Sequence, residues 1–238
     1  MFHAHRELKN APTERYIMVD FLRGLGVLLM IIFHFVFDLN FLRVFNVTFL
    51  NNLFWIGFGR LILTIFLVCV GMGLALVHKA GIKWNSVKKR FYKIGAWALI
   101  ITIVTYILLP RHYIFFGILH CIAVTSLVAV FFVNRPRLSL LLCLLIFIPH
   151  LIFQPTLIPI TKWLGVSSID YTPLYPWIGM VFLGIYLESI NFHRIFLKKN
   201  FLTKPFELMG KHSLKIYLAH QPILLSLLFI FSKLKGTV

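Results

Sequence analysis

The residues best suited to chemistry interrupt the first long apolar stretch of the chain, DFLRGLGVLLMIIFHFVFD, residues 20–38. They are Asp20, Arg23, His34 and Asp38. A helix turns by about 100° per residue, which places all four side chains within an arc of roughly 60°. An ionised group near the centre of a bilayer costs on the order of 2.5 to 3.5 kcal/mol, so we expect this face to point into the protein.

His34 and Asp38 lie one helical turn apart on that face. A carboxylate in this position can accept the ring N–H, fix the tautomer and raise the basicity of the imidazole, as a general base requires. We therefore predict His34 as a catalytic base and Asp38 as its partner. Asp20 and Arg23 lie nearer the other end, where a structural ion pair explains them as well as a functional role does.

Two more polar residues are expected at the depth of His34. Arg60, in IGFGRLILTIFLVCVGMG, can pair with Asp38 or stabilise an oxyanion. His120, in FGILHCIAV, can be a buried hydrogen-bonded side chain or part of a site shared with His34. Both are predicted members of the catalytic site.

A third group of residues is typical of phosphate binding. The segment MGKHSLKIYLAHQPIL begins a helix, and the N-terminus of a helix offers free N–H groups and a positive dipole end. A basic segment just before the third apolar run carries further cations. Together with Arg23, the predicted donor-binding residues are Lys88, Lys89, Arg90, Lys211, His212, Ser213 and Lys215.

Composition decides the kind of element that must position these side chains. The chain has 238 residues, of which 60% are hydrophobic, and a mean hydropathy of +0.89, which excludes a soluble globular domain. About 20 apolar residues in a helix cross a bilayer with every backbone group hydrogen-bonded. The sequence therefore predicts an all-α, polytopic transmembrane bundle of about seven spans, at residues 17–37, 53–77, 94–109, 113–133, 138–157, 173–187 and 213–231.

The net charge of +17 is distributed in a way that indicates topology rather than nucleic-acid binding. Most lysines and arginines fall in alternate connections between the spans, which predicts a cytosolic N-terminus by the positive-inside rule. We expect a cytosolic tail at residues 1–16, one membrane domain at 17–232 and a C-terminal tail at 233–238. Nucleic acid is not an expected partner; the lipid bilayer is.

Five blocks of the sequence carry a resemblance to known proteins: MVDFLRGLGVLLMIIFHFVFDL, FGRLILTIFLVCVGMGLAL, IFFGILHCIAV, YTPLYPWIGMVFLGIYL and MGKHSLKIYLAHQPIL. In this order they resemble the bacterial branch of the heparan-alpha-glucosaminide N-acetyltransferase-like membrane proteins. Arg23 and His34 are also similar to the paired motif of integral-membrane O-acyltransferases that modify surface polysaccharides.

The resemblance implies transfer of an acetyl group from cytosolic acetyl-CoA to an amine or hydroxyl of a sugar-containing acceptor on the far side of a bacterial cytoplasmic membrane. It implies no metal, and a homodimer stays open as the assembly. In the eukaryotic heparan enzymes the active histidine lies in the loop after the first of these blocks; here the loop LNFLRVFNVTFLNNL has none. His34 would then be the base or the acyl-accepting group, and Arg23 a donor-binding or structural partner.

Two other functions stay open at this point. A solute transporter or permease would use the same charged interior, although seven spans do not divide into two equal repeats. A non-catalytic membrane partner would retain the fold without binding acyl-CoA.

Overall fold

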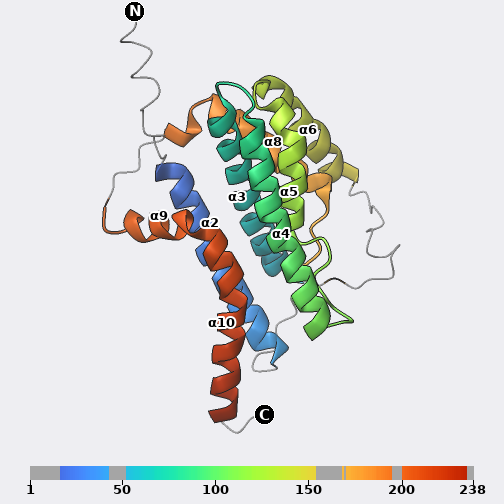
Figure 1. Ribbon diagram of the computed structural model, residues 1–238, viewed down its shortest axis with the longest axis vertical. Coiled ribbons are helices and arrows are strands. Elements are labelled where there is room, and N and C mark those ends of the chain that lie inside the picture. Colours follow the sequence, from blue (N-terminus) through green and yellow to red (C-terminus); the bar gives the residue numbers. More distant parts are fainter. Residues whose placement is uncertain (1–16, 43–51, 154–167, 169, 195–199, 235–238) are drawn as a thin grey trace, which may run out of the picture.

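The computed structural model describes residues 17–42, 52–153, 168, 170–194 and 200–234. Over these residues the chain forms a bundle of helices and no strand (Figure 1). The predicted N-terminal tail and the last four residues of the predicted C-terminal tail lie outside the described residues. The elements are α2 (Ile17–Phe41), α3 (Leu53–His78), α4 (Trp84–Leu108), α5 (Ile118–Ala129), η1 (Val130–Phe132), α6 (Pro136–Phe153), α8 (Leu174–Ser189), η2 (Phe192–Arg194), α9 (Thr203–Lys211) and α10 (Ser213–Leu234).

Each predicted span corresponds to an apolar helix. Five helices, α2, α3, α4, α6 and α10, are long and apolar enough to cross a membrane. The other two are shorter, because α5 has 12 residues before it passes into η1 and α8 has 16. The all-helical class is therefore confirmed, and helix length supports five of the seven predicted spans.

The third helix begins earlier than its apolar run predicts. α4 starts at Trp84, so the basic segment before residue 94 forms its first turns instead of a loop. Hydropathy alone misses this start because long basic side chains can lie along a helix and extend their charged ends toward the polar layer. As a result, Lys88, Lys89 and Arg90 have a helical register that decides where each points.

A short helix that the apolar pattern does not predict precedes the last span. α9 lies across the start of α2, as Figure 1 shows. The two backbones touch, since a Cβ added to Gly24 would collide with the carbonyl of Phe206, and one added to Gly210 with the carbonyl of Asp20. α9 thereby fixes the end of α2 that carries Asp20 and Arg23.

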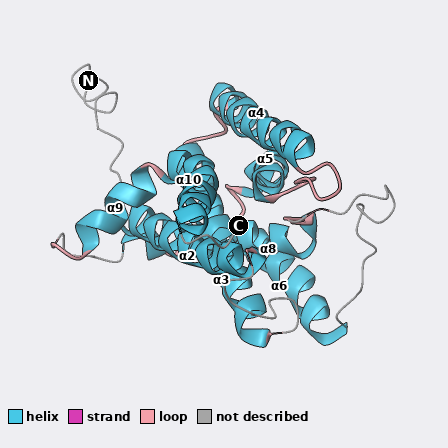
Figure 2. Cartoon of the chain, turned by 90° about the horizontal axis from the view of Figure 1, so that it is seen from below, coloured by secondary structure: helices cyan, strands magenta, loops and turns pink. Residues whose placement is uncertain are grey.

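The helices pack around α3 and α8. α3 contacts α2, α5 and α8, whereas α4 lies outside α5 and α6 lies outside α8, at opposite edges of the bundle in Figure 2. Few residues of α4, α6 and α10 are buried within the chain, which leaves their apolar outer faces for lipid. The inner faces of α2, α3, α4, α5 and α10 are therefore the ones available to form a site.

Glycines let α3 and α8 approach at backbone distance. A Cβ on Gly71 would collide with the carbonyl of Val181, and a Cβ on Gly184 with the carbonyl of Val68. Small residues at such crossings are the usual way in which membrane helices gain packing energy.

Replacing Gly184 by valine is expected to separate these helices and to cost about 1–3 kcal/mol or more, as overpacking does. The expected result is a lower thermal unfolding temperature of the detergent-solubilised protein, followed by tryptophan fluorescence. Gly95 on α4 is the matched control, because a Cβ there would meet no atom within 4 Å. Equal unfolding temperatures for Gly184→Val and Gly95→Val would contradict the packing assignment.

Candidate active site

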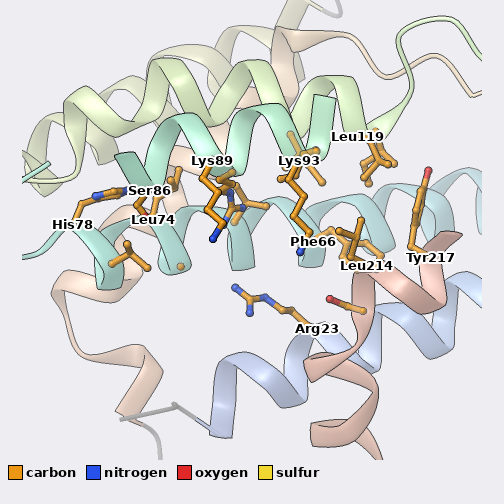
Figure 3. Close-up of a pocket in the computed structure, with 18 residues that line it drawn as sticks. Arg23, Phe66, Leu74, His78, Ser86, Lys89, Lys93, Leu119, Leu214 and Tyr217 are labelled. Carbon is orange, nitrogen blue, oxygen red and sulfur yellow. The ribbon is translucent and has the colours of Figure 1, made fainter. Parts of the chain in front are cut away.

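A cavity of about 530 Å³ lies between α2, α3, α4, α5 and α10. Figure 3 shows its two ends: His78, at the end of α3, and Tyr217, on α10, lie at opposite sides of the opening. The volume is typical of sites that hold a small molecule or cofactor. The residues discussed next determine what kind of molecule it suits.

One part of the cavity is strongly basic. Arg23 contributes from α2, and Lys89, Arg90 and Lys93 contribute from α4. In Figure 3, Lys89 and Lys93 extend from α4 toward the side on which Arg23 lies. The described residues that line the cavity include no aspartate or glutamate, and Arg90 Nε is buried without a hydrogen-bond partner among them. Such a surface favours an anion with several oxygen atoms, such as a phosphate.

Helix register explains which basic residues of α4 reach the cavity. Ser86, Lys89, Arg90 and Lys93 are spaced by three or four residues and share one face of the helix. Lys88, by contrast, does not line the cavity, although it is exposed like its neighbour Lys89. Of the predicted donor-binding residues in this segment, Lys89 and Arg90 are therefore in the site, and Lys93 belongs with them.

Arg23 lies in the wall of the cavity, on α2. Its guanidinium is 3.7 Å from Asp20 Oδ1, and Nη2 donates a 3.4 Å hydrogen bond to the carbonyl of Cys69. Gly73 on α3 provides the room, since a Cβ there would lie 2.8 Å from Nη2. Arg23 is thus both ion-paired and part of the cavity wall.

The predicted phosphate site at the start of α10 is only partly formed. Ser213 lines the cavity, whereas Lys211, His212 and Lys215 are exposed and do not. α9 runs almost directly into α10, and the N–H of His212 donates to the carbonyls of Leu208 and Met209 at 3.2 Å. A helix that follows another so closely offers fewer free N–H groups than an isolated N-terminus.

The other part of the cavity is apolar. Phe66, Leu119 and Leu214 line it, and Tyr217 lies at its end, as Figure 3 shows. The cavity therefore offers cations to one portion of a ligand and hydrocarbon to another.

Beyond Tyr217 lie two histidines in contact. The rings of Tyr217 and His220 have centroids 5.6 Å apart, and the ring of His220 lies 4.9 Å from that of His34 on α2. His220 Nδ1 is 2.6 Å from the carbonyl oxygen of Tyr217. Because a carbonyl can only accept, Nδ1 must carry the proton in the neutral ring, and Nε2 has a free lone pair.

Asp38 has a different partner from the predicted one. Its Oδ1 accepts a 2.8 Å hydrogen bond from Gln221 Nε2, and His34 forms no hydrogen bond with a described residue. α10 thus reaches the carboxylate that the helical spacing of α2 assigned to His34. At this level three buried polar atoms have no hydrogen-bond partner within the described part of the chain: Asp38 Oδ2, His220 Nε2 and Gln221 Oε1.

The other two predicted catalytic residues are not brought to this pair. Arg60 is exposed on α3 and forms no ion pair with Asp38 or any other described residue. His120 on α5 stacks on Phe116, with ring centroids 5.8 Å apart. The described ranges also contain no group of three or more His, Cys, Asp or Glu residues arranged to hold a metal ion.

Several residues of the candidate site are not among the individually predicted site residues. Lys93 belongs to the basic segment from which phosphate binding is expected, and helical spacing from Lys89 adds both Lys93 and Ser86 once α4 is known to start at Trp84. His220 and Gln221 are visible as polar residues next to Pro222 in the last span. Tyr217 gives no such signal, because tyrosine is common in apolar helices.

The comparisons with known proteins point to one family. The family model described as heparan-alpha-glucosaminide N-acetyltransferase, catalytic, matches residues 15–222. No curated protein and no solved structure matches the chain. The matched range includes the whole cavity and the residues from His34 to Gln221 described above.

Proposed function

Because the chain belongs to the heparan-alpha-glucosaminide N-acetyltransferase catalytic family, we propose that it is an integral-membrane enzyme that transfers an acetyl group from acetyl-CoA to an amine or hydroxyl of a sugar-containing acceptor. One observation carries the proposal beyond the family: a cavity with a basic part and an apolar end lies next to a pair of contacting histidines.

The basic part and the apolar end of the cavity match, in that sequence, the phosphates and the pantetheine arm of acetyl-CoA. Lys89, Arg90 and Lys93 are suited to the phosphates of CoA, with Arg23 facing them. The apolar end fits the pantetheine arm, so that the thioester arrives near Tyr217 and the histidines. The concentration of basic residues in alternate connections favours entry of the donor from the cytosol.

The histidine pair is suited to base catalysis. His34 removes the proton of the acceptor, while the free Nε2 of His220 can accept the other ring N–H of His34 and stabilise the imidazolium that forms. His220 then takes the orienting role that the sequence assigned to Asp38. The acceptor hydroxyl or amine needs polar neighbours in this dry region, and Asp38 Oδ2 and Gln221 Oε1 are buried and unpartnered there.

The side from which the acceptor arrives follows from the order of the polar residues along α2 and α10. Asp38 lies one helical turn beyond His34 on α2, on the side away from Arg23 and the cavity, and its hydrogen-bond partner Gln221 directly follows His220 on α10. We therefore propose that the acceptor reaches the histidines from the side opposite the donor, as in modification of a cell-envelope glycan across a bacterial cytoplasmic membrane.

Proteoliposomes test the function directly. The purified protein is reconstituted with radiolabelled acetyl-CoA and a panel of amino sugars and sugar alcohols, and acetylated product is separated and counted. The expected result is acetyl transfer that depends on protein and on a sugar acceptor. Release of CoA without any acetylated sugar across the panel, or no binding of acetyl-CoA at all, would count against the proposal.

A further inference from the structure

The hydroxyl of Tyr217 is a hydrogen-bond donor to which the chemistry above gives no task. Tyr217 lines the cavity at its apolar end. In Figure 3 its ring rises from α10 toward α5, with the hydroxyl at the tip. That hydroxyl forms no hydrogen bond with a described residue. A phenol placed in apolar surroundings usually finds a partner, so this position is suited to a ligand atom.

The same helix turn connects the hydroxyl to the histidines. Tyr217 and His220 are three residues apart on α10 and lie on one face, with ring centroids 5.6 Å apart. His34 follows at 4.9 Å from His220. A group that extends from the cavity to His34 therefore passes Tyr217.

We propose that Tyr217 is a catalytic hydrogen-bond donor whose hydroxyl binds the carbonyl oxygen of the acyl thioester. The inference rests on the proposed acetyl transfer and names the group that holds the reacting carbonyl. Its effect is largest in the transition state, where the oxygen becomes negative and a fixed donor in a water-poor site stabilises it most.

The step balances with the residues present. The oxygen or nitrogen of the acceptor bonds to the thioester carbon while its proton passes to His34, and the carbonyl electron pair moves to the oxygen held by Tyr217. The carbonyl then re-forms as the C–S bond breaks. The CoA thiolate leaves with that electron pair and takes the proton from His34, so that the protein returns to its starting state.

Asp170 is the ionisable group that acts electrostatically on Tyr217 from outside α10. Desolvation raises the pKa of Asp170 above its ordinary value, and a hydrogen bond from the backbone N–H of Ile118, at the start of α5, opposes this shift with a smaller effect. A carboxyl shifted toward its neutral form opposes a developing oxyanion less than a full negative charge would.

The test is Tyr217→Phe, which keeps the ring that packs against His220 and the core and removes only the hydroxyl. We expect kcat for acetyl transfer to fall by about 10²–10³-fold, the typical loss of one oxyanion donor. KM for acetyl-CoA should change little. A mainly structural role would instead lower the unfolding temperature and leave kcat of the folded fraction unchanged, and that result would overturn the inference.

Donor analogues give a second readout that needs no turnover. Acetonyl-dethia-CoA retains the carbonyl, and S-ethyl-CoA lacks it. The wild-type protein is expected to prefer the first, and Tyr217→Phe to lose that preference; a wild-type protein without the preference would refute the role even if the variant did not fold. If acetyl transfer proceeds and Tyr217→Phe is as fast as wild type, the proposed function stands and this inference fails. If the wild-type protein transfers no acetyl group, the proposed function itself fails.

Discussion

Replacing His34 by asparagine is expected to lower the rate of acetyl transfer by about 10²–10⁴-fold, the usual contribution of a positioned general base. The reason is its place beside His220, whose tautomer leaves Nε2 free to support the protonated form of His34. Initial rates with labelled acetyl-CoA in proteoliposomes give the measurement. Asparagine is chosen because it is small and polar and leaves the neighbouring Phe33 and Asp38 in place.

A measurement of acetyl-CoA binding distinguishes a loss of catalysis from a general loss of structure. His34 does not line the basic cavity, so His34→Asn should bind acetyl-CoA with the wild-type Kd. His220→Asn is the companion variant, because an asparagine amide can keep a hydrogen bond to the Tyr217 carbonyl while Nε2 is lost. It should also slow transfer without weakening donor binding. A wild-type rate in His34→Asn would remove His34 from the mechanism.

The second large effect is expected from Lys89→Gln, which should raise the Kd for acetyl-CoA by about 10–100-fold. A hydrogen bond to a charged group contributes about 1.5–3 kcal/mol, and each 1.4 kcal/mol is a factor of ten. Lys89 lines the cavity next to Arg90, where no acidic residue of the described lining competes for it. Isothermal titration of the detergent-solubilised protein measures the change.

Lys88 offers a control with the same change of charge. Lys88→Gln removes one positive charge from the adjacent position of α4, and both lysines are exposed, yet only Lys89 lines the cavity. The Kd of Lys88→Gln for acetyl-CoA should therefore stay within a small factor of the wild-type value. The ratio of the two Kd values should approach one as the salt concentration increases. Equal losses in the two variants would show that the helix attracts CoA only through its general charge, and the cavity would no longer be the donor site.

Sequence alone was sufficient for the class of fold and for the identity of the polar groups. Spanning helices follow from hydrophobicity, because a chain that enters lipid must satisfy its backbone groups within the helix. Arg23 and His34 also stand out without coordinates, since an ionisable residue in an apolar run carries a cost that packing alone does not explain. The structure places Arg23 in the cavity and His34 beside His220.

The sequence could not decide which of several residues of equal charge in one segment lines the cavity. Lys88 and Lys89 differ only in the direction in which α4 points them, and that direction depends on where the helix starts and which neighbours it packs against. Lys211 and Lys215 are exposed and do not line the cavity for a related reason, because α9 leads directly into α10 and sets the register of that helix start.

The tertiary structure also decided which polar side chains meet in the candidate active site. Spacing on α2 gave His34 a partner one turn away, but α10 approaches that face and supplies Gln221 to Asp38 and His220 to His34. Periodicity records which residues share a face of one helix, whereas contact between two helices depends on how both pack. The sequence by itself determined that this protein is a membrane bundle with a charged, histidine-containing interior; only the packing of α10 against α2 determined which atoms of that interior meet.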